Sequence, residues 1–346
     1  TVFCFMIVSI ARGQTIVYPP DAPPNVKLAA KEVRRYGNLR TGKMLAIADP
    51  SDRTTRTDRI ILSVEPALGP QEFRLKTEGG NTVITAGSAI GVLYGAYRYA
   101  ELLGVRFYLH GDVIPDDHLA ELPAVNESGK PVFALRGILP FHDFPQGPDL
   151  WEADDYKAVL TQMVKLRMNF IGLHTYTECG WGSEPTVWLG LPEDVGTDGH
   201  PAFSYASFYV NTERNTGGQR GRRTDRYGYG ASEIFESSAW GPSVMKGLMP
   251  HGKTVEEKNE VFDRAGKLLN DAFTFARRFG VKTCVGTEIP LTHPDRLLPH
   301  ELRARLNERG KSVQDPEVHK ALYKGAFLRA MRTYPLDYYW LWTPES

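Results

Sequence analysis

The chain has 346 residues, which is long enough for two domains with a core each. Lys and Arg together number 41, as do Asp and Glu, so the formal net charge is zero. This balance excludes a general electrostatic attraction to nucleic acid or to an anionic membrane surface. An apolar content of 42% is ordinary for a folded protein and argues against a globally disordered chain.

The chain begins with an apolar run, Val2–Ala11, that is too short to span a bilayer. Small residues follow it at positions 11 and 13. Residues 1–14 are therefore predicted to be the remnant of a secretory signal peptide whose basic start is missing. A buried N-terminal strand is the alternative. We expect a secreted or periplasmic protein with no membrane span.

The chain contains three cysteines, Cys4, Cys179 and Cys284. No motif spacing links Cys179 and Cys284, so both are predicted to be small core residues rather than a disulfide or a metal pair. No dinucleotide fingerprint or phosphate-binding glycine loop occurs in the required strand–turn–helix context. We expect no cofactor and no metal.

Residues 15–116 are predicted to form a separate small α/β domain. Hydrophobic periodicity and turn residues indicate an open sheet backed by two helices. The expected elements are a helix over Asn25–Tyr36, a strand over Arg59–Val64, a hairpin of Glu72–Thr77 with Thr82–Thr85 around Gly79 and Gly80, a helix from Ser88 to Leu103, and a closing strand over Val105–Leu109.

The end of this domain carries a pattern that resembles known carbohydrate-active enzymes. The stretch Ala86–Tyr108 contains the pattern Gly-x-x-x-Gly-x-Tyr-x-x-x-x-Leu-Leu-Gly-Val. It resembles the end of the N-terminal domain of α-glucuronidases of glycoside hydrolase family 67 and of family 20 β-hexosaminidases. In both families this domain, an α/β sandwich, precedes a catalytic barrel, and it carries no catalytic residue there.

Residues 117–131 are rich in Pro, Asp and Glu and are predicted to be a linker. Residues 132–346 are predicted to be the first half of a (β/α)8 barrel, because strand and helix patterns alternate. The expected strands are Phe133–Pro140, Asn169–Tyr176, Val281–Glu288 and Asp337–Trp342. Helices are expected from Asp154 to Met168, over Glu256–Phe279, and from Asp315 to Thr333. Four strands are half of a barrel, so we expect a chain truncated at both ends.

A long excursion, residues 179–256, interrupts the barrel pattern. It is rich in Gly, Trp, Tyr and Arg and shows no sustained period, which is typical of a lid or another functional loop. Its segment Arg214–Arg226 holds five arginines among glycines. This segment is either a solvated loop, or a clamp for an anionic sugar or a contact with the neighbouring domain.

The predicted strands end on residues suited to glycoside hydrolysis, which needs one protonated and one ionised carboxyl group. Glu345 follows the aromatic run of the fourth strand, and the resemblance implies a general acid at that place. Glu288 ends the third strand and is predicted to be the second carboxylate or a substrate ligand. The alternative for either residue is a salt bridge that only orients loops.

Four other polar residues also lie at predicted strand ends, and two tryptophans lie in the excursion and in the fourth strand. His142, Asp143, His174 and Glu178 are predicted to hydrogen-bond sugar hydroxyls, although a metal site or a structural role stays open. Trp181 and Trp340 are candidate stacking platforms for a sugar ring, with core packing as the alternative.

The sequence therefore predicts a glycosidase that resembles α-glucuronidase and acts on polysaccharide-derived oligosaccharides. A β-hexosaminidase is an alternative, but its acid would follow an Asp, whereas Pro344 precedes Glu345. A non-catalytic glycan-binding protein on a barrel scaffold is the other alternative. In many such barrels the second carboxylate comes from a later strand, so we expect no turnover by residues 1–346 alone. The sequence predicts neither the sugar nor the oligomeric state.

Overall fold

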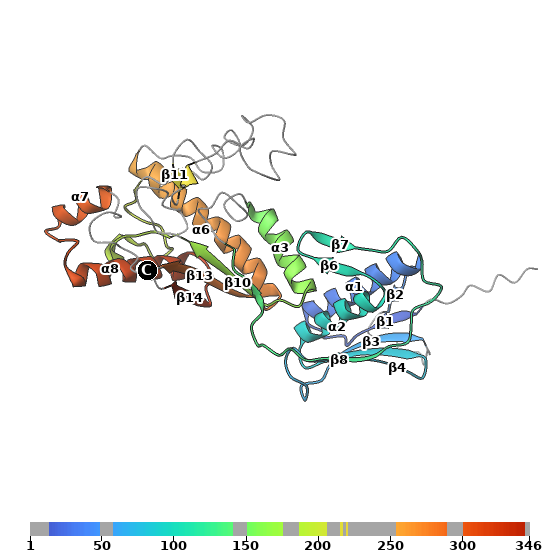
Figure 1. Cartoon of the computed structure of the whole chain (residues 1–346). Coiled ribbons are helices and arrows are strands. Elements are labelled where there is room, and N and C mark those ends of the chain that lie inside the picture. Colours follow the sequence, from blue (N-terminus) through green and yellow to red (C-terminus); the bar gives the residue numbers. More distant parts are fainter. Residues whose placement is uncertain are drawn as a thin grey trace, which may run out of the picture. The chain divides into compact units, whose positions relative to one another are not determined.

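The computed structural model describes residues 14–48, 58–140, 151–175, 187–205, 215–216, 219–220, 254–288 and 300–342 (Figure 1). The chain divides into two compact units. The N-terminal unit comprises Thr1–Arg136 and Thr161–Met168, and the C-terminal unit comprises Gly137–Leu160 and Asn169–Ser346. Each unit is described by itself.

The N-terminal unit is built on a sheet with the order β2-β1-β3-β5-β4-β8. The first four neighbours in this order pair in parallel, whereas β4 is antiparallel to both β5 and β8. The strands are β1 Thr15–Val17, β2 Ala46–Ile47, β3 Arg59–Val64, β4 Phe73–Glu78, β5 Asn81–Ala86 and β8 Asn126–Gly129.

The predicted hairpin is confirmed as the pair β4 and β5. Its two turn residues, Gly79 and Gly80, have φ angles of +57° and +81°. A two-residue turn with both central φ angles positive matches the twist of the flanking strands, and glycine adopts it without steric cost.

Two helices, α1 (Pro24–Thr41) and α2 (Ala89–Leu102), cover one face of this sheet (Figure 1). The Ser88 side chain caps α2 by accepting a hydrogen bond from the Gly91 amide at 3.3 Å. Arg40, at the end of α1, is buried and donates to the carbonyl of Leu103 at 2.7 Å. This bond satisfies a carbonyl beyond the last turn of α2.

The glycines of the motif in α2 have a packing role. A Cβ atom at Gly91 would lie 2.9 Å from the Cβ of Ala86, and one at Gly95 would lie 2.8 Å from a methyl group of Ile84. A Cβ at Gly87 would lie 2.2 Å from a backbone oxygen of Gly69. Spacing of four residues places these glycines on one side of the helix start, so α2 approaches β5 closely.

The prediction of a closing strand over Val105–Leu109 is wrong. The strand there, β6 (Arg106–Tyr108), does not join the main sheet but pairs antiparallel with β7 (Gly111–Val113). Phe107 packs edge-on against the rings of Tyr36 and Tyr97, with centroid distances of 5.5 and 5.6 Å. These contacts hold β6 on the helices rather than on the sheet.

The segment 117–131, which the sequence predicted to be a linker, contains β8. This strand pairs with β4, and Val125 and Thr77 exchange a further pair of hydrogen bonds beside it. The sequence did not predict this strand because β8 reads Asn-Glu-Ser-Gly and lacks the hydrophobic alternation of a buried strand. Among the described residues, β8 pairs with one other strand, β4.

A buried charge pair belongs to the N-terminal unit and joins residues far apart in sequence. Lys165 Nζ lies 2.9 Å from both carboxylate oxygens of Asp112, and Tyr36 donates its hydroxyl to the same carboxylate at 2.8 Å. Burial works to raise the pKa of Asp112, but these hydrogen bonds and the charge of Lys165 lower it below its ordinary value.

The C-terminal unit contains a parallel sheet with the order β14-β13-β10-β9. The strands are β9 Gly137–Ile138, β10 Phe170–Thr175, β13 Lys282–Glu288 and β14 Tyr338–Trp342. The connecting segments contain helices, namely α3 Ala153–Lys165, α6 Val255–Arg278, α7 His300–Glu308 and α8 Pro316–Thr333. Consecutive strands are therefore neighbours in the sheet, as the barrel prediction requires. Closure into an eight-stranded barrel stays a prediction.

The helix boundaries follow their capping residues. Thr254 and Glu257 form a capping box at the start of α6, with hydrogen bonds of 3.1 and 3.2 Å. Gly280, with a φ of +68°, follows the end of α6. Asp315 caps α8 by accepting from the Glu317 amide at 2.9 Å, and Pro316 is the first helical residue.

Part of the predicted excursion packs as core rather than as an open loop. Residues 187–205, with the short helix η2 (Pro192–Asp194), share a hydrophobic cluster with α6, α7 and α8. This cluster includes Trp188, Tyr205, Phe262, Leu306 and Leu322.

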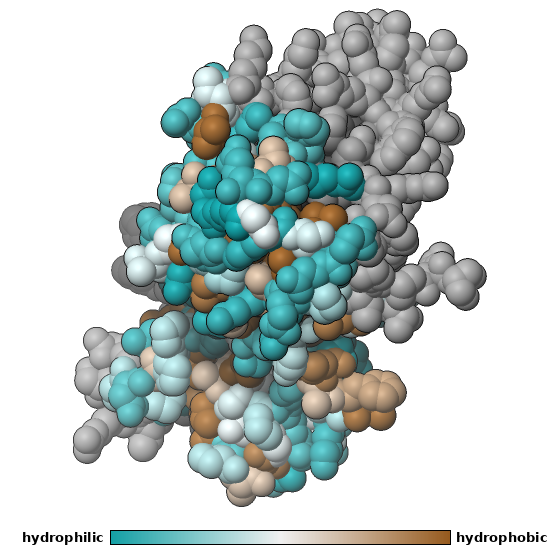
Figure 2. All heavy atoms as spheres, turned by 90° about the vertical axis from the view of Figure 1, so that its left-hand side faces the viewer, coloured by the Kyte–Doolittle hydropathy of each residue, from teal (hydrophilic) through white to brown (hydrophobic). Residues whose placement is uncertain are grey.

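Figure 2 views the molecule from the side of α7 and α8, where mostly hydrophilic residues cover the described surface. Within the described ranges, no helix is long and apolar enough to cross a membrane.

Candidate functional site

The candidate site lies where β10, β13 and β14 end. Parallel pairing aligns His174 with Gly286 and Gly286 with Trp340. Two residues further along the strands, it aligns Glu288 with Trp342. Parallel strands present their carboxyl ends at one edge, and in β/α enzymes this edge carries the chemistry. These residues therefore occupy the edge at which the sequence placed the site.

Three aromatic rings meet at this edge. The indole rings of Trp340 and Trp342 are 4.5 Å apart between centroids, with their planes at 62°. The imidazole ring of His174 lies nearly parallel to the Trp342 ring, at 20° and 5.5 Å, and 5.8 Å from the Trp340 ring. His174 is 2% exposed, whereas both tryptophans are partly exposed. The buried imidazole therefore packs against the two partly exposed indole rings from the protein interior.

The missing side chain of Gly286 leaves the space in which these rings contact each other. Gly286 lies on the central strand, between His174 and Trp340 in the register. A Cβ atom at position 286 would lie 2.8 Å from Cε3 and 3.3 Å from the Cβ of Trp340. Because glycine leaves this space open, rings from β10 and β14 contact each other across the strand between them.

Residues on the opposite face of the same strands pack against α8 and hold the strands in place. Tyr339 points to α8, where its ring packs against Phe327 at 4.6 Å, and its hydroxyl lies 3.0 Å from the hydroxyl of Thr287. Burial raises the pKa of Tyr339, so this phenol stays protonated in the physiological range. Side chains alternate along a strand, so Trp340 and Trp342 lie on the face away from α8.

The N-terminal ends of β13 and β14 are joined by polar contacts. The carboxylate of Asp337 accepts hydrogen bonds from the Thr283 amide at 3.1 Å and from Lys282 Nζ at 2.9 Å. Burial works to raise the pKa of Asp337, but these bonds and the charges of Lys282 and Arg277 lower it. This end of the sheet is structural, and it holds β14 in register with β13.

Cys284 lies in this sheet as a buried free thiol. Burial raises the pKa of the Cys284 thiol to about 11, so it is protonated and unreactive at neutral pH. Its burial as a free thiol confirms the prediction that it is a core residue. Among the described residues, no cluster of three or more His, Cys, Asp or Glu side chains could hold a metal ion.

The structure brings two of the predicted site residues together, His174 and Trp340. Glu288 is the last residue of β13, beside Trp342 in the register. The remaining predicted site residues lie outside the described residues, namely His142, Asp143, Glu178, Trp181 and Glu345.

Two residues of the site were not predicted as such, Trp342 and Gly286. Both left a signal in the sequence. Trp340 and Trp342 are two positions apart in a predicted strand, so they share a face, and a glycine inside a strand often marks the close approach of another group.

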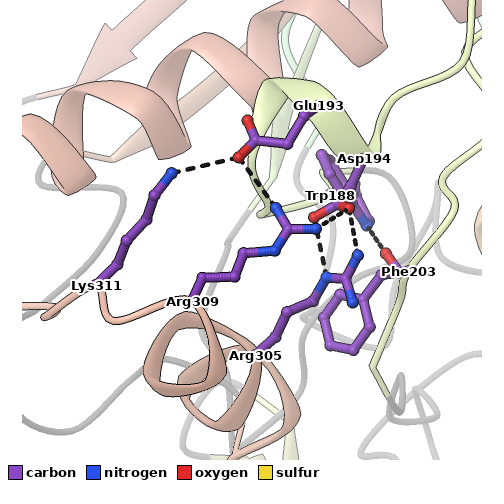
Figure 3. Close-up of polar contacts among 7 residues, drawn as sticks. All are labelled: Trp188, Glu193, Asp194, Phe203, Arg305, Arg309 and Lys311. Carbon is purple, nitrogen blue, oxygen red and sulfur yellow. Dashed lines mark hydrogen bonds and ion pairs between the residues drawn. The ribbon is translucent and has the colours of Figure 1, made fainter.

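The excursion segment holds α7 and the residues that follow it through a second set of polar contacts (Figure 3). Asp194 is 3% exposed and pairs with Arg305 and Arg309, with Nη2–Oδ1 distances of 2.5 and 3.0 Å. Glu193 pairs with Arg309 at 3.0 Å and with Lys311 at 3.3 Å. The charges in this cluster are paired with one another, so we assign it a structural role.

The fold is similar to that of a glycoside hydrolase of known structure. An enzyme of glycoside hydrolase family 138 targeting pectin rhamnogalacturonan II matches 96% of this chain with a TM-score of 0.52 and 13% identity, over 38% of its own length. The chain thus spans about two fifths of that structure. At this identity the likeness defines the fold alone.

Two further structures are similar to a lesser degree. The β-N-acetylhexosaminidase from Bacteroides fragilis matches 96% of this chain and 54% of its own, at 12% identity and a TM-score of 0.47. The chitobiase from Flavobacterium johnsoniae matches 95% of this chain and 41% of its own, at 12% identity and a TM-score of 0.46. No protein-family model and no curated protein sequence matches the chain.

Proposed function

We propose that this chain contains the substrate-binding edge and part of the catalytic apparatus of a glycosidase that cleaves polysaccharide-derived oligosaccharides. One observation carries the proposal, which is that parallel strands of a glycoside hydrolase fold bring His174, Trp340 and Trp342 together at their carboxyl ends beside Glu288. Indole faces suit the apolar faces of sugar rings, and an acidic residue at the same edge suits acid–base catalysis.

The proposed roles follow from the chemistry of glycosidic bonds. Glu345 donates a proton to the leaving oxygen, and Glu288 is the second carboxylate or a ligand of the sugar hydroxyls. The sugar-binding roles proposed for His142, Asp143 and Glu178 rest on their places at predicted strand ends, and the stacking role proposed for Trp181 rests on its place in the excursion. An α-glucuronidase-like activity is the first specific form of the proposal, and a β-hexosaminidase-type activity is the second. Secretion or a periplasmic location is part of the proposal, since polysaccharides lie outside the cytoplasm.

The test is hydrolysis by the protein expressed from its complete open reading frame. The substrates are aldouronic acids, N-acetyl-β-glucosaminides, pectin-derived oligosaccharides and a panel of aryl glycosides. We expect turnover that falls by about 10³-fold or more in Glu345→Gln, because general acid catalysis contributes factors of about 10²–10⁴. Glu345→Gln should bind its substrate as the wild type does. Binding of oligosaccharide without turnover of any substrate would favour a non-catalytic glycan-binding protein.

A further inference from the structure

The aromatic rings at the strand ends differ in what they leave for a ligand. His174 stacks on Trp342 at an angle of 20°, so it covers one face of that indole. His174 itself is buried, whereas Trp342 is partly exposed. A ligand that stacks on Trp342 would therefore do so on the indole face opposite His174.

Trp340 has a different place. Its ring lies across Gly286, as the 2.8 Å approach of Cε3 to a built Cβ shows, and it stands at 62° to the Trp342 plane. An indole inclined in this way forms a side wall next to the flat surface of Trp342. The position of this wall depends on the absence of a side chain at position 286.

We propose that Trp342 and Trp340 form a subsite for one pyranose ring, and that Gly286 sets its width. The ring stacks its apolar face on Trp342, in the layer order His174, Trp342, sugar, while Trp340 bounds it on one side. The glycoside hydrolase fold and the position at the carboxyl ends of parallel strands favour a sugar over another flat ligand. This inference rests on the proposed function, and it adds the residues that select the ring.

The test measures binding by calorimetry and by tryptophan fluorescence, using methyl pyranosides and the oligosaccharides of the substrate panel. Trp342→Leu should weaken binding about tenfold, which corresponds to about 1.4 kcal/mol, because the aromatic contact with the ligand is lost. Trp342→Phe should keep most of the affinity, since it keeps an aromatic face. Gly286→Ala should weaken binding about threefold and change the order of preference among ligands, because the added methyl group displaces the Trp340 ring.

Tyr338→Leu is the matched control. Tyr338 lies on the same strand and the same face and is 44% exposed, but it is at the other end of β14, about 13 Å from Trp342 along the strand. Its substitution should change affinity by less than about twofold. Thermal unfolding of each variant verifies that it is folded, and Trp342→Phe supplies the comparison if Trp342→Leu does not fold.

The outcomes distinguish a failure of the proposed subsite from a failure of the proposed glycosidase function. Loss of affinity in Trp342→Leu with retention in Trp342→Phe and Tyr338→Leu supports the subsite. Equal affinity of wild type and Trp342→Leu, or equal loss in Tyr338→Leu, overturns the subsite and leaves the proposed glycosidase standing if turnover persists. A folded wild-type protein that binds no sugar of the panel overturns both.

Discussion

Asp194 is a buried carboxylate whose charge is matched by two guanidinium groups. Burial works to raise its pKa, but hydrogen bonds and charges from Arg305 and Arg309 lower it below the ordinary value. A carboxyl group with a depressed pKa in the folded state stabilises the fold at neutral pH, and this contribution is lost as the pH falls through the folded-state pKa.

Asp194→Asn should therefore destabilise the protein by about 2–4 kcal/mol at pH 7, because two arginines lose a buried partner. The difference from wild type should shrink as the pH falls below about 4, where the wild-type carboxyl is protonated in the unfolded chain and then in the folded one. Urea unfolding at several pH values measures both effects. Asp154→Asn is the control, because its ion pair with Lys157 is on the surface; an equal loss there would contradict the assignment.

Two helix glycines, Gly325 and Gly95, differ in the atoms that an added side chain would contact. A Cβ at Gly325 in α8 would lie 1.9 Å from the carbonyl oxygen of Gly190, a backbone atom that cannot move alone. A Cβ at Gly95 in α2 would meet a methyl group of Ile84 at 2.8 Å, and a side chain can shift.

Gly325→Ala should thus destabilise the protein by about 1–3 kcal/mol. Gly95→Ala should cost less than about 1 kcal/mol, because the better helix propensity of alanine offsets part of the clash. Chemical denaturation of the two variants tests the order, and a smaller loss in Gly325→Ala would show that residues 187–205 yield to α8.

At the scale of the element, the start of α6 depends on a reciprocal pair of hydrogen bonds between Thr254 and Glu257. Thr254→Ala should destabilise the protein by about 1 kcal/mol, the usual effect of losing such a cap. Thr254→Ser should be within about 0.5 kcal/mol of wild type. Amide hydrogen exchange at the first turn of α6 gives a local readout, and unchanged protection in Thr254→Ala would contradict a role of this cap.

Strong local signals predicted most elements, and long-range contacts decided the rest. Periodicity and caps predicted α1, α2, α6 and α8, and the glycine pair predicted the β4–β5 turn. The site could be predicted only as a set of strand ends. That His174 meets Trp342 depends on a register across three strands, and no local pattern specifies a register of that kind. The place of β6 depended likewise on the fit of Phe107 between two tyrosines.

At the scale of the whole molecule, each of the two compact units has buried hydrophobic residues of its own among those that the structure describes. Leu93 is fully buried in the N-terminal unit, and Leu322 is fully buried in the C-terminal unit. Units with cores of their own can unfold in separate steps, so a single two-state transition is not expected.

Calorimetry should accordingly resolve two unfolding transitions. Leu93→Ala should lower one of them and Leu322→Ala the other, each by ~5–15 °C, because such a truncation costs about 2–5 kcal/mol. A single transition that both substitutions lower equally would show that the two units unfold together.

The N-terminal unit is discontinuous along the chain, since Thr161–Met168 belong to it and the residues between 136 and 161 do not. This has a consequence for synthesis on the ribosome. Asp112 emerges 53 residues before Lys165, the cation that neutralises it. Until that lysine emerges, the nascent N-terminal unit has to bury a carboxylate without its ammonium partner, which is unfavourable. The N-terminal unit is therefore completed only after α3, which contributes residues to both units, has been synthesised.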